Sequence, residues 1–422
     1  MMKIFFSAIL IIVSSFQLKA SQLLVPMDES QNNHLKAYGI AFWTLENEVV
    51  IEWLLNYRGG SFLMPHLRTI EEELIIRGVK YEVLADGQVN QIKNLIGNPE
   101  VNMEIVQLEK APKIAVYTPN TSQPWDDAVT MVMEYAEIPY EKIYDSAIVM
   151  GVLPKFDWLH LHHEDFTGQY GKFYANYRSY PWYKEQVAAA ERDAEMLGFK
   201  KVSELKLAVA SSIKNFVAGG GFLFTMCSGT DSFDIALAAH NTDICESMFD
   251  GDPTDPRAQD KLDYSNSFAF EDYKLVRDPM IYEYSEIDGT ELRRLYRVTE
   301  NTDKFTLFEF SAKWDIVPTM LTQCHTDVVS GFMGQTTDFK KDFIKPNVLV
   351  MGENKSIGTA RYLHGEYGQG TWTFYGGHDP EDYEHRVGDP HTDLNLHPNS
   401  PGYRLILNNI LFPAAKKQKR KT

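Results

Sequence analysis

One segment, residues 219–232, constrains the fold of this chain more than any other. Three glycines open it, and a short apolar run then ends at Cys227, which Ser228 and Gly229 follow directly; residues 233–240 have a helical pattern. A cysteine on a tight strand-to-helix turn is held out of the sheet, beside backbone N–H groups that can lower a thiol pKa and bind an oxyanion. The segment predicts that Cys227 is a nucleophile. The alternative is a buried structural cysteine, the usual fate of this residue type.

Strands and helices alternate along the chain from residue 113 onward, and this pattern predicts the fold class. The expected strands are 114–117, 157–163, 222–227, 347–351 and 371–375, and the expected helices are 125–135, 182–197, 202–217, 233–240 and 401–411. Such alternation is typical of an α/β protein with a doubly wound parallel sheet covered on both faces. Ligands bind at the carboxyl ends of the strands in these sheets, and Cys227 lies at such an end.

The remaining segments define the predicted domain organisation. Residues 21–110 are expected to form a small N-terminal α/β unit, with helices at 35–45 and 69–77 and strands at 49–57 and 102–108. The main domain spans 111–413 and carries a large insertion, 241–346, that we expect to shape or cover the site. Inside it, 293–298 and 305–310 look like strands. Residues 414–422 are basic and are expected to be a disordered tail.

The N-terminus predicts the compartment of the protein. Lys3 precedes the apolar run 4–13, and Ala20 offers a small residue at a cleavage point, which is the pattern of a secretory signal peptide over 1–20. The chain has no other run long and apolar enough to span a bilayer. We therefore expect an exported protein, periplasmic or secreted, with no integral membrane segment after signal cleavage.

The net charge limits the class of partner that this chain is expected to bind, and the cysteine count limits the disulfides that it can form. The chain carries 58 acidic against 41 basic residues, a formal net charge of −17, which argues against binding nucleic acid. A small molecule, a peptide or a carbohydrate is the expected partner. Three cysteines leave two possibilities open: a Cys245–Cys324 disulfide with Cys227 free, or three thiols.

A second chemical motif follows the strand expected at 371–375. Two glycines lead into His378, and Asp379 and Glu381 come next. A histidine at a strand end with a carboxylate close behind suits a general base and the group that orients it, so Cys227, His378 and Glu381 would form a nucleophilic triad. The alternative is that His378 caps its loop and that both carboxylates are solvated.

These motifs and their order resemble the class I glutamine amidotransferase-like superfamily. Its members place a cysteine elbow after a glycine-preceded strand, as in 219–229, and a histidine, often followed by Pro-Glu, after the last strand, as in 377–381. Many close with a helix similar to the one expected after Asn399. The resemblance covers roughly 113–240 and 347–413.

The resemblance implies a flavodoxin-like fold and a cysteine-dependent amide or peptide hydrolase that needs no cofactor. It implies Cys227 as nucleophile, His378 as base and Glu381 as the partner of that base. Trehalose-utilisation-type proteins would be more distant relatives.

One departure from the family pattern concerns the oxyanion site. Where a glycine-rich loop is expected after the third strand, this chain has His162, His163 and Glu164. We expect these three side chains, together with Ser228 and Gly229, to form the oxyanion site and pocket.

Three alternative functions remain open from the sequence. Ser228 to Ser232 resembles the pyrophosphate loop of asparagine synthetases, a label that relatives are expected to carry, but one loop glycine is missing and an exported protein lacks ATP. His160 and His162 share one face of a strand and could bind metal with His378, giving a metal-dependent hydrolase. The aromatic residues of 170–183 could instead bind a carbohydrate or peptide without catalysis, or simply pack together.

Overall fold

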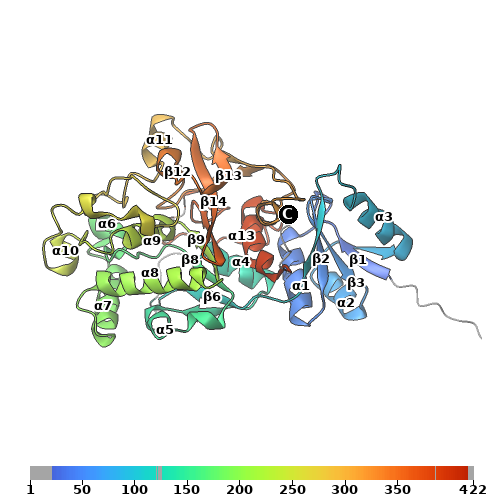
Figure 1. The fold of residues 1–422 in the computed structure, drawn as a ribbon, viewed down its shortest axis with the longest axis horizontal. Helices are drawn as coiled ribbons and strands as arrows, with labels where there is room; N and C mark the ends of the chain where they lie inside the picture. The colour runs from blue at the N-terminus through green and yellow to red at the C-terminus, as the bar shows by residue number, and fades with distance from the viewer. Residues whose placement is uncertain (1–20, 120, 122–125, 385, 417–422) are drawn as a thin grey trace, which may run out of the picture.

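The computed structural model describes residues 21–119, 121, 126–384 and 386–416. The predicted signal peptide and residues 417–422 of the predicted tail lie outside this part of the chain. Two sheets divide it into a small N-terminal unit, drawn in blue, and a larger domain that carries the elbow (Figure 1).

The N-terminal unit is a five-stranded antiparallel sheet with helices on both faces. Its strands run in the order β4-β1-β3-β2-β5. Their bounds are Ser21–Val25 (β1), Ile51–Leu55 (β2), Ser61–Pro65 (β3), Glu82–Ala85 (β4) and Glu104–Leu108 (β5), and the helices are His34–Glu46 (α1), Arg68–Ile76 (α2) and Asp86–Ile96 (α3). Successive side chains of β1 alternate between the cluster that contains α1 and α2 and the cluster that contains α3, as strand geometry requires. The sequence patterns anticipated α1, α2, β2 and β5; the three remaining strands and α3 were not predicted.

The large sheet confirms the predicted α/β fold class. Five of its strands pair in parallel in the order β7-β6-β8-β9-β15. They span Ile114–Tyr117 (β6), Glu141–Ile143 (β7), Trp158–Leu161 (β8), Phe222–Met226 (β9) and Gly370–Tyr375 (β15). Numbered along the chain, this is the flavodoxin-like order 2-1-3-4-5, with the crevice at the carboxyl ends of the strands.

An antiparallel extension continues this sheet beyond β15, which makes the sheet mixed. It consists of Thr359–Tyr367 (β14), Leu349–Asn354 (β13), Lys304–Leu307 (β10) and Val328–Ser330 (β11), with Phe339–Lys340 (β12) paired to β14. The strand expected at 347–351 is β13, which pairs antiparallel with β14. The insertion is built into the sheet, since β10, β11 and β12 all come from it.

Helices cover both faces of the parallel strands because successive strand side chains are apolar on both sides. Val116 and Phe224 face the cluster that includes Ala128–Ala136 (α4) and Pro401–Leu411 (α13), whereas Ala115 and Leu223 face the opposite cluster. The opposite face holds Asp145–Val149 (α5), Val202–Ala218 (α8) and Ser228–Ala238 (α9), with Pro181–Met196 (α7) packed on α8.

The N-terminal unit docks on the main domain through α1, which contacts both α4 and α13. Gly39 makes this approach possible, because a Cβ there would lie 1.9 Å from the carbonyl oxygen of Ala136. At the other end of the domain, the backbone N–H of Lys416 donates to the carbonyl of Gln107 in β5, so the chain is held against the N-terminal sheet up to that residue.

The structure of the insertion differs from one sequence prediction. Residues 293–298 were expected to be a strand, but Thr290–Leu295 is a helix (α11). Asp288 accepts a hydrogen bond from the backbone N–H of Thr290 at its start, and the turn directs the buried Arg293 toward Asp303 and Asp338. The predicted strand at 305–310 is β10. The other short helices are Tyr174–Tyr177 (α6), Ser247–Asp250 (α10) and Ile316–Leu321 (α12).

Two further properties of the described residues bear on the sequence predictions. None of the helices formed by these residues has the length and apolar character needed to cross a bilayer. The three cysteines are free thiols, which resolves the choice that the sequence left open.

Candidate functional site

Cys227 occupies a strained turn between β9 and α9. Its backbone has φ 50° and ψ −142°, a conformation that side chains other than glycine rarely adopt. Helix α9 begins at the next residue, Ser228, five positions before the helix that the sequence predicted. The carbonyl of Cys227 accepts hydrogen bonds from the backbone N–H and the hydroxyl of Thr230, and its N–H donates to the carbonyl of Gly377. The turn is thus tied to the loop that carries His378.

The thiol of Cys227 is buried and surrounded by backbone donors. Only 2% of the residue is exposed, and burial raises the pKa of the thiol to about 11. Backbone N–H groups of Thr336, Gln335 and Ser228 act in the opposite direction, the Gln335 nitrogen lying 3.3 Å from Sγ. At neutral pH the resting group is a thiol, so nucleophilic attack requires a base to remove its proton.

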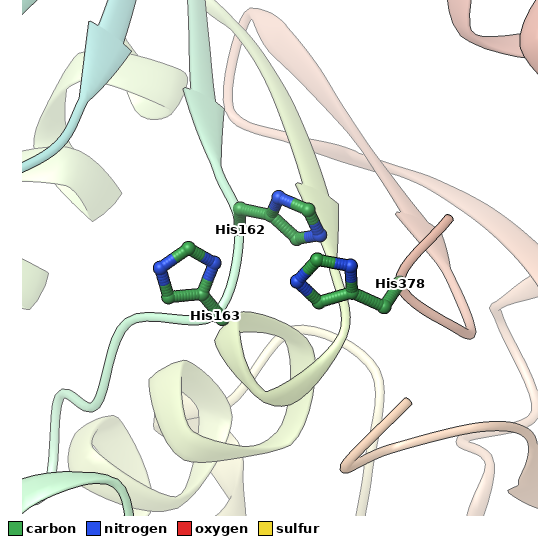
Figure 2. Close-up of side chains that lie close together, drawn as sticks. All are labelled: His162, His163 and His378. Carbon is green, nitrogen blue, oxygen red and sulfur yellow. The ribbon is translucent and has the colours of Figure 1, made fainter. Parts of the chain in front are cut away.

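Three histidines meet beside this turn. His162 and His163 follow β8, and His378 follows β15 (Figure 2). The ring centroids of His162 and His378 are 4.2 Å apart, and those of His163 and His378 are 5.7 Å apart. One ring nitrogen from each of the three lies within 4.8 Å of the other two. The parallel sheet brings them together because β8, β9 and β15 are consecutive neighbours with their carboxyl ends on one edge.

Cys227, His163 and His378 line one cavity of about 500 Å³. Its aromatic wall is formed by side chains from both the predicted aromatic run and the insertion: Phe173, Tyr177, Tyr180 and Tyr282. Met333, Gly334 and Gln335 of the insertion complete the wall next to the thiol. The insertion therefore shapes the site, as the sequence suggested.

Glu381, the predicted third member of a triad, has other described partners. Its carboxylate lies 3.0 Å from Nδ1 of His397, and burial raises its pKa against the opposing effect of the Ser400 hydroxyl. The neighbouring Asp379 is fully buried and accepts hydrogen bonds from the hydroxyls of Tyr403 and Thr392. The structure brings Cys227 and His378 together, and the pairing of His378 with Glu381 stays a prediction.

Asp127 is a site residue that the sequence reading missed. Its Oδ2 lies 3.4 Å from Nε2 of His160 and 3.3 Å from Nδ1 of His162, while its Oδ1 caps α4 by accepting from two backbone N–H groups. Burial alone would raise the pKa of Asp127, but His162 and His160 outweigh it and hold that pKa well below its usual range. Asp127 fell inside the helix predicted at 125–135, whereas α4 begins at Ala128; the preference for aspartate at an N-cap was the available signal.

His160 contacts Asp127 rather than His378. Its Nδ1 is 3.2 Å from the carbonyl of Phe224, and burial lowers its pKa although Asp127 opposes this. The histidines that cluster with His378 are therefore His162 and His163, rather than the predicted alternative set of His160, His162 and His378.

The other residues predicted for the oxyanion site have structural contacts. The N–H of Gly229 donates to the carbonyl of His162 at 2.7 Å, which fixes α9 against the end of β8. Glu164 is buried, and burial raises its pKa to about 8 although Lys206 opposes the shift. Ser228 is fully buried and contributes its backbone N–H to the thiol.

The segment that resembles a pyrophosphate loop is the buried first turn of α9. The hydroxyl of Ser232 donates to the carbonyl of Glu164, and Asp231 accepts from the hydroxyl of Thr336. This segment is a helix whose polar side chains bond to the protein, so it does not form an open loop that could wrap a phosphate.

The insertion and the His378 loop approach each other closely. A Cβ on Gly334 would lie 3.0 Å from backbone atoms of Gly377 and His378, and a Cβ on Gly377 would lie 2.4 Å from the ring of Phe332. Gly377 also has φ +99°, which favours glycine. These contacts join segments far apart in sequence, so no local pattern could have revealed them.

Comparison with known proteins finds no sequence relative of this chain. No family model matches the chain, and no curated protein matches it. Solved structures that are similar include two from Salmonella typhimurium, "Cytoplasmic Protein STM3548" (TM-score 0.33, 9% identity) and "Cytoplasmic Protein STM1381" (TM-score 0.35, 11% identity). In both cases the match covers 72% of this chain and the whole of the other chain. A beta-galactosidase from Bacillus circulans sp. alkalophilus has a TM-score of 0.26 and 13% identity over 74% of this chain and 32% of its own. The fold assignment rests on the strand order described above.

Proposed function

We propose that this chain is an exported, amidotransferase-like cysteine hydrolase that cleaves an amide or peptide bond. The observation that carries the proposal is the strained backbone of Cys227, because strain of this kind persists where the surrounding structure enforces it and clusters at active sites. The flavodoxin-like strand order, with this cysteine at the carboxyl end of β9, supports the same assignment.

In the proposed reaction, the imidazole of His378 takes the proton of the Cys227 thiol. The thiolate attacks the substrate carbonyl carbon, and the backbone N–H of Ser228, the residue after the nucleophile, donates to the developing oxyanion. Collapse breaks the C–N bond, and the imidazolium returns its proton to the leaving amine; water then hydrolyses the thioester. The aromatic wall of the cavity suits the apolar faces of a peptide or a glycan-linked amide.

The test compares Cys227 with the other thiols of the same chain. Iodoacetamide labelling of the processed protein at neutral pH, read out by peptide mass spectrometry, is expected to modify Cys227 faster than the buried Cys245. Labelling of Cys227 is expected to slow at least tenfold in His378→Ala. Hydrolysis of a panel of peptide and glycan-linked amides is expected to be abolished in Cys227→Ala.

Two variants that lack the Cys227 thiol provide a matched control for folding. Cys227→Ala keeps the unfavourable φ, whereas Cys227→Gly removes it, so the glycine variant should be more stable than the alanine variant by about 1–3 kcal/mol. Both should be inactive. Equal labelling of Cys227 and Cys245 together with undiminished turnover in Cys227→Ala would refute the hydrolase.

Export is part of the proposal and has a separate measurement. The mass of the mature protein is expected to correspond to cleavage after Ala20, with the protein found outside the cytoplasm. An unprocessed protein retained in the cytoplasm would contradict export without bearing on the hydrolase.

A further inference from the structure

We propose that His162, His163 and His378 bind one divalent transition-metal ion, with Zn²⁺ as the representative metal. This site goes beyond the proposed hydrolase and does not depend on it. The three rings converge from two strand ends (Figure 2), and His163 and His378 line the cavity that Cys227 also lines.

The geometry of the cluster is close to that of a bound site. A Zn–N distance of about 2.0–2.1 Å in a tetrahedral site separates ligand nitrogens by about 3.3 Å. The three candidate nitrogens already lie within 4.8 Å of one another, so small side-chain rotations bring them to ligand distance. Three protein ligands leave the fourth position open, and His163 and His378 face the cavity from which water or a small ligand would fill it.

His162 is oriented as metal-binding histidines usually are. Its Nδ1 lies 3.3 Å from Oδ2 of Asp127, and a carboxylate at this position favours the tautomer that leaves Nε2 with a lone pair. The residue is 1% exposed, and among the described residues its Nε2 has no hydrogen-bond partner. A buried, unpartnered nitrogen that borders two other imidazoles is the observation that points to a ligand, because a buried polar atom without a partner is unfavourable.

The donor set selects the class of metal. Three imidazoles and no oxygen ligand suit Zn²⁺ and its first-row neighbours, whereas Mg²⁺ and Ca²⁺ prefer carboxylates and carbonyls. Asp127 does not serve as a ligand here, since one of its oxygens caps α4 and the other faces His160 and His162.

A second candidate metal site among the described residues, formed by Asp243, Cys245 and Asp250, already has a cationic partner. Asp243 and Asp250 lie near Cys245, but Nζ of Lys201 is 2.6 Å from the carboxylate of Asp243 and 3.0 Å from that of Asp250. That cluster already holds a cation of the protein itself. We therefore place the proposed metal site at the histidine cluster.

His378 cannot bind the metal ion and act as the proposed general base at the same time. A ring nitrogen of His378 that binds metal cannot take the thiol proton of Cys227. Bound Zn²⁺ is therefore expected to slow alkylation of Cys227, which links the two proposals through a measurable effect.

The experiment measures metal binding directly, in untagged protein stripped with EDTA. Isothermal titration with ZnCl₂ is expected to show one site per chain, and His163→Gln and His378→Gln are each expected to weaken it at least tenfold. Asp127→Asn keeps the N-cap, since asparagine caps as well as aspartate, and should weaken binding about 10- to 100-fold. His66→Gln, in the N-terminal unit, is the matched control and should bind as the wild type does.

A second measurement, the absorption spectrum of bound Co²⁺, uses the wild-type protein and so does not depend on whether the variants fold. Co²⁺ added to the wild-type protein is expected to give the intense visible absorption of a four-coordinate nitrogen site. A weak octahedral spectrum, the absence of Zn²⁺ binding, or variants that bind like the wild type would each overturn the proposal. The titration and the hydrolysis assay are both made on the wild-type protein, so that Zn²⁺ binding without hydrolysis refutes only the hydrolase, and hydrolysis without Zn²⁺ binding refutes only the metal site.

Discussion

Gly229→Ala tests the packing that positions both the cysteine turn and His162. A Cβ at this position would lie 2.2 Å from the carbonyl oxygen of His162 and 3.1 Å from Cγ2 of Thr225. The oxygen belongs to the backbone, so α9 and the end of β8 must separate by about 1 Å to relieve a contact of this kind, which costs about 1–3 kcal/mol. The 2.7 Å hydrogen bond from the Gly229 N–H to the same oxygen breaks as well, at about 1 kcal/mol.

The expected net loss is about 2–3 kcal/mol, since alanine regains up to about 1 kcal/mol of helix propensity. With an unfolding entropy of about 2.1 cal/mol/K per residue over roughly 400 residues, this lowers Tm by about 3 °C. Urea denaturation followed by circular dichroism gives the free energy, and Cys227 labelling reports on the turn.

Gly87→Ala is the matched control for this substitution. Gly87 lies in α3, and no atom stands within 4 Å of an added Cβ. This variant should be as stable as the wild type or up to about 1 kcal/mol more stable. If Gly229→Ala were equally harmless, the reasoning from the close contact would be wrong.

Two further substitutions test buried charges. Burial raises the pKa of Asp231 to about 8, and nearby Asp288 adds to the effect, so the stability contributed by its protonated carboxyl is present below about pH 4 and is lost as pH rises through 8. Between pH 5 and 8 the free energy of unfolding, obtained from urea denaturation, should therefore fall less steeply in Asp231→Asn than in the wild type, by on the order of 1 kcal/mol per pH unit. Parallel profiles would contradict this. Lys206→Met removes the cation 2.9 Å from the buried Asp145 and should cost about 3–5 kcal/mol, partly recovered in the double variant with Asp145→Leu; a loss below about 1 kcal/mol would refute it.

In the main domain, local sequence patterns were sufficient to predict those strands and helices that have a distinct hydrophobic or turn pattern of their own. The glycine-led apolar run and the cysteine that ends it became β9 and the turn, and Pro401–Leu411 is a helix with the bounds that were expected. The pattern failed at 293–298, because Arg293 is buried by its ion pairs with Asp303 and Asp338 rather than by apolar periodicity. The short strands of the N-terminal sheet also lacked a distinct local pattern.

The candidate site was predictable only in part. Cys227, His162, His163 and His378 could be named because each lies at or just after the carboxyl end of a predicted strand, and these ends lie on one edge of a parallel sheet. The partners of these residues could not be named: Asp127 comes from the start of α4, Gln335 and Thr336 come from the insertion, and each reaches the site through a contact distant in sequence.

The sequence by itself determined the α/β class and the cysteine at a strand end, because hydrophobic periodicity and a glycine-led turn are local properties. Only the tertiary structure decided that the insertion would join the sheet and surround the thiol, and that burial would raise the pKa of Cys227 to about 11. It also decided that His163 rather than His160 would join His162 and His378, since successive strand residues point to opposite faces and only the turn after β8 brings His163 to the site. Distance between side chains is a property of the packed chain, and the chemistry proposed for this protein depends on it.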